Sequence, residues 1–292
     1  MNELKKIIEL EETEKKNWLR IIQTERKKHI KEPNFYIKNA IQKINQNNIS
    51  KNIQEIRDIS WNQYTQDEIN FYKQVIKILI EKKYPSEVFD FTVNASKISH
   101  LVLLSKEEIF LEIKEIFGNF TALIFPYLYE LSKSVTQSRR SRAGKSFEAI
   151  VQYLMEQKKI PYHNQSKIGS TIFKNLGLGK IVDGIVPSIE HYQKNRSKCM
   201  ILTMKTTLRE RWQEVIEELN RTKIPSIYLL TLDEAISSNT LDIMKEHNIT
   251  IVVYDFIKAK HQQHTNIISF EELFEQEIKH ILSGWGNEFK NN

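Results

Sequence analysis

The sequence predicts an α/β (α+β) protein in which a central mixed sheet, flanked by helices, follows a helical N-terminal subdomain. Two observations lead to this expectation. Apolar residues recur at helical spacing through most of the first 130 residues. After residue 140, short apolar runs of strand length alternate with segments of helical spacing, which is typical of a sheet covered by helices. We therefore expect a division near residue 130, with a helical subdomain at 1–130 and a sheet-containing core at 131–292.

Helical spacing is clearest in three segments of the N-terminal part. One helix is expected at 66–83, where Thr65 fits the N-cap position and Glu68, three residues later, completes a capping box. A second helix is expected at 106–117 and should end at Gly118. A more apolar helix should follow it directly.

The C-terminal part carries four apolar runs that are short enough to be strands, with helical segments around them. The expected strands are 181–186, 199–204, 226–231 and 249–254, and the expected helices are 142–158, 207–220, 239–247 and 270–282. This order predicts a mixed sheet rather than a helical bundle.

Composition excludes several classes of protein. Charged residues make up 27% and apolar residues 40% of the chain, which are ordinary globular values. The single cysteine, Cys199, excludes a disulfide framework and a cysteine-based zinc site. The start of the sequence lacks a signal-peptide core and no apolar run is long enough to span a bilayer, so we expect a cytoplasmic protein.

The balance of charge is compatible with a nucleic-acid partner. The chain has 43 Lys and Arg against 37 Asp and Glu, a net charge of +6. The densest cluster is the basic segment, which we define as Arg139, Arg140, Arg142 and Lys145 with the residues between them. It leads into the helix expected at 142–158, so cations and free backbone N–H groups would meet at a helix start, which suits phosphates. The alternative is a solvated surface turn.

Four residues of the C-terminal part could carry chemistry together. Asp183 interrupts an apolar strand, which is costly unless the carboxylate is used, and Lys205 ends the next strand. Glu218 on the following helix and Glu148 on the preceding one could complete a set of hard oxygen ligands for Mg²⁺. Carboxylates and a lysine around Mg²⁺ suit phosphodiester hydrolysis. The alternative for Asp183 is a salt bridge to Lys205.

Two stretches of sequence sharpen this interpretation. The first is Ser138-Arg139-Arg140-Ser141-Arg142-Ala143-Gly144-Lys145-Ser146-Phe147-Glu148, and the second is Thr203-Met204-Lys205 followed by Thr206-Thr207-Leu208-Arg209-Glu210-Arg211-Trp212. With Val182-Asp183-Gly184, they resemble the type II restriction endonucleases of the EcoRII, SsoII and PspGI group, which have the PD-(D/E)XK nuclease fold. The resemblance covers roughly 137–220. Thr203 stands where the usual acidic residue precedes the lysine, so the resemblance implies the displaced carboxylate, Glu218.

The resemblance also implies which residues read DNA bases. Arg209, Glu210 and Arg211 follow Lys205 at the spacing of the group's base-reading element. Arginine can donate two hydrogen bonds to guanine, and glutamate can accept one from cytosine, so the assignment is chemically reasonable. The alternative is a solvated helix face. Gln137 matches a position that the SsoII branch uses in the minor groove.

A further implied feature is extrusion of the central base pair of the site. Arg57 and Trp61 are four residues apart and would share a helical face, where Trp61 could stack on a flipped base. The alternative is that Trp61 is a core residue. Trp18 and Trp212 are expected to pack.

Taken as implied by the resemblance, the protein is a Mg²⁺-dependent type II restriction endonuclease acting on double-stranded DNA as a homodimer. Its site would be of CC-N-GG or CC-W-GG type and cleavage would leave 5′ overhangs and 5′-phosphates. A cognate cytosine DNA methyltransferase would act on the same site without stable contact. Two alternatives stay open: a PD-(D/E)XK nuclease of DNA repair or structure-selective type, and a non-catalytic DNA-binding protein.

Overall fold

The computed structural model describes residues 9–44, 48–82, 104–178, 181–209, 211–222 and 224–289. The chain forms two compact units. The helical unit consists of Met1–Glu32 and Trp61–Ser141, and the sheet unit consists of Pro33–Ser60 and Arg142–Asn292. This division differs from the predicted one at residue 130, because the segment 33–60 belongs with the sheet and the long helix leaves the helical unit later.

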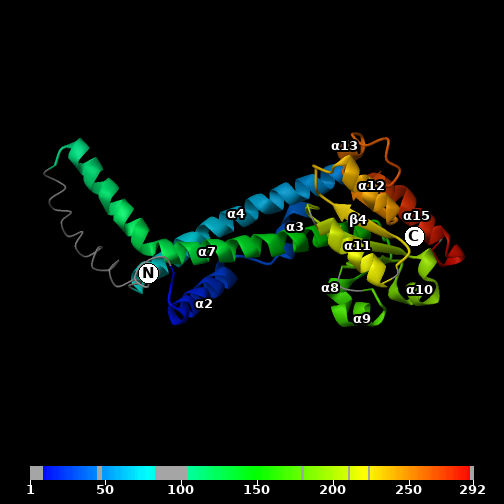
Figure 1. Ribbon diagram of the computed structural model, residues 1–292, viewed down its shortest axis with the longest axis horizontal. Helices are drawn as coiled ribbons and strands as arrows, with labels where there is room; N and C mark the ends of the chain where they lie inside the picture. The colour runs from blue at the N-terminus through cyan, green and yellow to red at the C-terminus, as the bar shows by residue number, and fades with distance from the viewer. Residues whose placement is uncertain are drawn as a thin grey trace. The chain divides into compact units, whose positions relative to one another are not determined.

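The helical unit is built from α2 (Glu12–His29), the later part of α4 (Ile49–Glu81) and the earlier part of α7 (Lys106–Gln157). In this unit α4 and α7 run side by side (Figure 1). Trp18 is 2% exposed, and its indole N–H donates to the carbonyl of Tyr127 over 2.9 Å. The prediction that Trp18 packs is confirmed.

Two predicted helix boundaries were wrong. Thr65 lies inside α4, and its hydroxyl donates back to the carbonyl of Trp61 over 2.7 Å instead of capping a helix start. Likewise α7 continues through Gly118 and the buried Pro126. The basic segment therefore lies within α7, where backbone N–H groups are used by the helix, and it does not offer a helix N-terminus to phosphate.

The sheet unit contains a six-stranded mixed sheet, which confirms the predicted fold class. Its strands lie in the order β1 (His163–Asn164), β2 (Gly184–Val186), β3 (Met200–Lys205), β4 (Ile227–Thr231), β5 (Ile249–Val253) and β6 (Ile267–Ser269). The first three strands pair antiparallel, and β3 to β6 pair parallel. Because the parallel strands are covered on both faces, β3 and β4 read as continuous apolar runs.

Helices surround this sheet (Figure 1). They are α3 (Pro33–Ile41), the start of α4, the end of α7, α8 (Gln165–Ile168), α9 (Ser170–Asn175), α10 (Ile189–Lys194), α11 (Arg211–Thr222), α12 (Ser238–Glu246), α13 (Asp255–Lys258), α14 (Phe270–Glu272) and α15 (Ile278–Ser283). A π-helical turn at Leu273–Glu277 joins the last two, so they form the single helix predicted at 270–282.

Segment 33–60 is tied to the sheet unit by hydrogen bonds to its last helix. The Ser50 backbone N–H and hydroxyl each donate to the Glu271 carboxylate over 2.7 Å.

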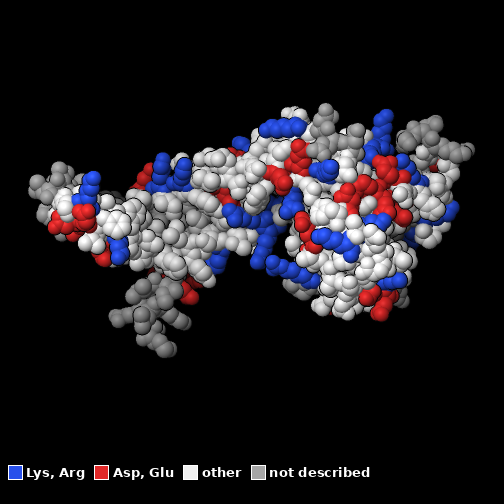
Figure 2. Space-filling model, turned by 90° about the horizontal axis from the view of Figure 1, so that it is seen from above, with Lys and Arg blue, Asp and Glu red and all other residues white. Residues whose placement is uncertain are grey.

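On the face drawn in Figure 2, basic and acidic side chains are interspersed. Among the described helices, none combines the length and apolar character that crossing a bilayer requires.

Candidate active site

Asp183 lies directly before β2 and is held by the neighbouring strand, β3. Its backbone N–H donates to the carbonyl of Leu202 over 2.9 Å. Its Oδ2 accepts a hydrogen bond from the Met204 backbone N–H over 2.6 Å and one from the Thr203 hydroxyl over 3.4 Å. The carboxylate is half-buried and is therefore held rigidly beside the end of β3.

Lys205 is the last residue of β3 and the first of that strand to reach solvent. The five residues before it are buried, whereas Lys205 is half-buried. The parallel neighbour of Lys205 is Thr231, at the end of β4, so the lysine lies at the carboxyl edge of the parallel strands. Sites in open α/β sheets form at this edge.

Glu148 on α7 lies within electrostatic reach of both residues. Burial raises the pKa of Glu148, the charge of Asp183 raises it further, and Lys205 and Lys145 oppose the shift. Burial and the neighbouring charge of Asp183 both disfavour the ionised form, so the pKa of Glu148 lies above its ordinary value. The structure thus places Glu148 close enough to Asp183 and Lys205 for their charges to act on it, and the catalytic role of the three residues stays a prediction.

A fourth neighbour, Tyr162, was missed by the sequence analysis. A Cβ placed on Gly184 would lie 2.5 Å from the Tyr162 hydroxyl oxygen and 2.6 Å from Cζ, so the ring lies directly on the glycine. Burial raises the pKa of the Tyr162 hydroxyl, and the charges of Asp183 and Glu148 raise it further. The feature of the sequence that could have indicated this contact is Gly184, because a residue without a side chain leaves room for the Tyr162 ring against β2.

Glu218 is placed differently from the other carboxylates. It lies on α11, is half-buried, and forms an ion pair with Arg221 one turn later. Among the residues that the structure describes, no group of three or more acidic, histidine or cysteine side chains could hold a metal ion. The predicted set of Asp183, Glu148 and Glu218 is therefore not gathered into one cluster, and the role of Glu218 stays a prediction.

The donor chemistry of the remaining pair fits a hard divalent cation. Asp183 and Glu148 offer carboxylate oxygens, which Mg²⁺ prefers, and their mutual repulsion would be relieved by a cation between them. Two carboxylates alone do not fill the coordination shell of Mg²⁺, so a site at this pair would be completed by water or by oxygens of a substrate.

The predicted base-reading element forms a turn and the start of a helix. Arg209 is exposed and has a φ of 38°, in the left-handed region that side chains rarely adopt. Just before it, the backbone N–H of Leu208 donates to Asp233 over 2.8 Å. Glu210 lies outside the described residues, and Arg211 begins α11. Sequence reasoning missed Asp233, which fixes this turn from the loop after β4.

The other predicted DNA contacts lie along two helices. Gln137, Arg140 and Lys145 are exposed on α7, Arg142 is half-buried there, and Arg139 is paired with Glu68 of α4. Arg57 and Trp61 both lie on α4, which confirms that their segment is helical.

Exposure separates the tryptophans of the chain. Trp61 is 44% exposed, so the alternative that it is a core residue is wrong. Trp212 is half-buried and packs against the core, as predicted.

Residues 107–274, more than half of the chain, match the family described as EcoRII C terminal. The chain is 39% identical over 170 residues to the type II restriction enzyme SsoII of Shigella sonnei, covering 58% of this chain and 55% of that protein. It is 27% identical over 136 residues to the type II restriction enzyme EcoRII of Escherichia coli, covering 46% and 31%. The chain thus spans about half, or less, of these relatives.

Two solved structures match a larger share of this chain than these two relatives do. Metal-depleted Ecl18kI in complex with uncleaved DNA is 30% identical with a TM-score of 0.75, covering 94% of this chain and 86% of that one. The complex of the restriction endonuclease PspGI with substrate DNA has a TM-score of 0.58 at 18% identity, covering 87% and 94%. The second likeness concerns the fold alone, and both support a restriction-endonuclease fold.

Proposed function

Because the chain belongs to the family of the EcoRII C-terminal domain, we propose that it is a type II restriction endonuclease that cuts both strands of DNA at a short specific site. The family match agrees with the resemblance of residues 137–220 to the EcoRII, SsoII and PspGI group. The observation that carries the proposal is the meeting of Asp183, Lys205 and Glu148 at the edge of the mixed sheet. The fold around them is similar to that of Ecl18kI, which was solved in complex with DNA.

In the proposed reaction, a water molecule attacks phosphorus and the bond to the 3′ oxygen breaks. The water gives its hydroxyl to the phosphorus and its proton to the leaving oxygen, so the products are a 5′-phosphate and a 3′-hydroxyl. Lys205 orients the water and stabilises the negative charge that develops on the phosphoryl oxygens. Its place on a buried strand holds the ammonium without reorganisation of the protein.

Asp183 and Glu148 would hold the metal, which we propose to be Mg²⁺. When bound, the ion polarises the scissile phosphate and neutralises charge. The hydrogen bond from the Met204 N–H holds Oδ2 of Asp183 at the end of β3. Glu218 could join them only by leaving its ion pair with Arg221.

Site recognition is proposed to come from the turn before α11 and from α7. Arg209, Glu210 and Arg211 read G·C pairs in the major groove, and Gln137 contacts the minor groove. The basic segment binds the phosphate backbone, with Arg140, Arg142 and Lys145 as its principal cations. The support is that Arg209 is exposed in a turn that Asp233 fixes.

We further propose a homodimer on a site of CC-N-GG or CC-W-GG type, cut before the first C to leave 5′ overhangs. The central bases are flipped and Trp61, with Arg57 near it on the same helix, provides the stacking surface. Protection of the same site would come from a separate cytosine DNA methyltransferase.

The test is a plasmid digest with wild type and Asp183→Ala, in Mg²⁺ and in EDTA. We expect discrete bands from wild type in Mg²⁺ alone, no cleavage by Asp183→Ala, and specific binding by both in a gel-shift assay. A smear of fragments would favour a structure-selective or repair nuclease. Specific binding without any cleavage by wild type would favour a non-catalytic DNA-binding protein.

A further inference from the structure

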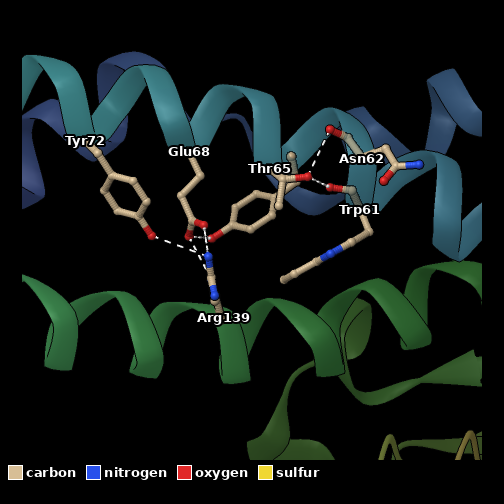
Figure 3. A network of polar contacts seen from close by, with 7 residues as sticks. Trp61, Asn62, Thr65, Glu68, Tyr72 and Arg139 are labelled. Atoms are coloured by element: carbon tan, nitrogen blue, oxygen red, sulfur yellow. Dashed lines mark hydrogen bonds and ion pairs between the residues drawn. The ribbon is translucent and has the colours of Figure 1, made fainter.

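We propose that Glu68 is a positioning residue that fixes Arg139 and Tyr64, and through them the exposed indole ring of Trp61, so that the ring is held ready for an unstacked base. The inference rests on the base-flipping part of the proposed function and names the residue that prepares its stacking surface. All four residues belong to the helical unit, on α4 and α7 (Figure 3).

Trp61 is an exposed aromatic residue with two fixed neighbours. The residue lies on α4 and is 44% exposed. The ring centroid of Tyr64 lies 5.2 Å from that of Trp61, at an interplanar angle of 37°. The guanidinium carbon of Arg139 lies 5.7 Å from the Trp61 centroid, within the range of a cation–π contact. The indole is thus bordered by an aromatic ring and a cation, while part of its surface stays open to solvent.

One carboxylate binds both of these neighbours. Glu68 is 2% exposed, and its two oxygens accept hydrogen bonds from Arg139 Nε over 3.1 and 3.0 Å. Arg139 Nη2 and the Tyr64 hydroxyl also donate to this carboxylate. Figure 3 shows the Glu68 carboxylate facing the Arg139 guanidinium. Arg139 and Tyr64, which donate to this carboxylate, are the same residues that border Trp61. A loss of Glu68 would therefore release both sides of the indole at once.

Glu68 and Arg139 form an ion pair, and each favours the charged form of the other. Burial raises the pKa of Glu68, but the hydrogen bonds from Arg139 and Tyr64 outweigh it, and the pKa lies below its ordinary value. The hydrogen bond to Glu68 raises the pKa of Arg139. A buried carboxylate needs such a partner, so Arg139 is required to compensate the charge of Glu68, although its own side chain is 43% exposed.

This pairing changes the role of Arg139. Its positive charge is compensated by Glu68, although its side chain is exposed like those of Arg140 and Lys145 on the same helix. A compensated guanidinium attracts phosphate less than an unpaired one does, because the net charge of the pair is zero. We therefore assign Arg139 to the support of Trp61 instead of the DNA backbone contacts predicted from sequence.

A fixed ring stacks on a base at lower entropic cost than a mobile one. An exposed side chain loses rotamer freedom when a ligand immobilises it, and a preformed surface has already lost that freedom in the free protein. The guanidinium plane of Arg139 can itself contribute to stacking on a base. These properties suit a base that has left the duplex and needs an aromatic partner.

The first experiment detects the fixed ring without DNA. The chain has four tryptophans, and labelling with 5-fluorotryptophan gives each a fluorine resonance; Trp61→Phe assigns one of them. We expect Glu68→Gln to shift or broaden the Trp61 resonance and to leave the other three unchanged. The matched control is Glu25→Gln, since Glu25 is also nearly buried in the helical unit and pairs with Lys28 over 2.5 Å. This control should leave Trp61 unchanged.

The second experiment adds DNA that carries 2-aminopurine at the central pair, without divalent metal. Wild type and Glu25→Gln should raise the fluorescence on binding, and Glu68→Gln should change the plateau by at least about twofold, because the plateau depends on where the extruded base sits. At saturating protein the plateau does not depend on affinity or on melting temperature. A residue that only stabilises the fold would therefore leave it unchanged.

Each outcome decides a separate point. An unchanged Trp61 resonance in folded Glu68→Gln overturns the positioning role. Should Glu68→Gln fail to fold, Tyr64→Phe removes one hydrogen bond to Glu68 while keeping the ring, and it must shift the Trp61 resonance for the inference to stand. If wild type gives no 2-aminopurine signal although Glu68→Gln shifts Trp61, base flipping is refuted and the fixed indole is retained.

Discussion

The contact between Gly184 and Tyr162 leads to a sharp prediction about the active site. Gly184 follows Asp183 directly, and the structure leaves no space for a side chain there. The Cβ of Gly184→Ala would lie 2.5 Å from the Tyr162 hydroxyl oxygen and 2.6 Å from Cζ. Contacts below about 3.4 Å between such atoms are strongly repulsive, so either the ring or strand β2 has to move.

The expected cost has two parts. Overpacking of this kind destabilises a protein by about 1–3 kcal/mol. A shift of β2 also displaces Asp183, and a misplacement of about 1 Å of a catalytic group can cost about 100-fold in rate. We therefore expect Gly184→Ala to lose far more activity than its loss of stability explains at temperatures where it is folded.

The assay combines thermal melts with single-turnover cleavage below the melting transition. Gly118→Ala is the matched control, because nothing lies within 4 Å of its Cβ and it sits in the interior of α7. This control should gain about 0.5–1 kcal/mol, since alanine is the better helix former. Tyr162→Ala makes room for the new methyl group, so adding Gly184→Ala in that background should cost little.

The double-mutant cycle supplies the refutation. If Gly184→Ala costs the same with and without the Tyr162 ring, the ring is not what excludes a side chain at this position. Wild-type melting and cleavage of the single variant Gly184→Ala would contradict the packing directly.

Other predictions concern charge and site recognition. Because the pKa of Glu68 is lowered, its contribution is present above the ordinary carboxyl pKa and is lost as pH falls through the folded-state value. Glu68→Gln should thus lower the free energy of unfolding by about 1–3 kcal/mol at neutral pH. Thermal melts at several pH values should show that the difference from wild type becomes smaller in acid, and a difference that does not change with pH would contradict this. Lys205→Ala should slow single-turnover cleavage about 100- to 1,000-fold while DNA is still bound; comparable loss of binding would argue against a transition-state role. Arg209→Ala should lose about 1–3 kcal/mol of discrimination at one guanine. Asp233→Ala, which removes the acceptor of the Leu208 N–H, should weaken the same discrimination. Competition binding with singly substituted DNA sites tests both variants, and an unchanged ratio of affinities for the intact and substituted sites would refute them.

The strands and the catalytic residues were predictable because their signals are local. Strands that are buried on both faces are continuous apolar runs, and β2 to β5 coincide with the four predicted runs except for Lys205 at the end of β3. A carboxylate inside one run and a lysine at the end of the next then define an edge of the sheet. By contrast β1 has two residues, neither of them apolar, and β6 has only two consecutive apolar residues, Ile267 and Ile268, so neither lies in an apolar run of strand length.

The long helices and the Glu68 network were not predictable because their causes are distant in sequence. Gly118 and Thr65 are ordinary helix boundaries by local rules, yet α7 and α4 continue through them. Glu68 fits a capping box locally, but its partner, Arg139, is 71 residues away. A pairing at that separation leaves no pattern in a single sequence, and so the arginine was grouped with its basic neighbours instead.

Sequencing the DNA ends from a Mg²⁺ digest tests the central claim, site-specific cleavage, most directly. We expect every end to derive from one short site that opens with CC and closes with GG, with a 5′-phosphate on a 5′ overhang. Ends that share no sequence, or that form only at junctions and damaged bases, would contradict it.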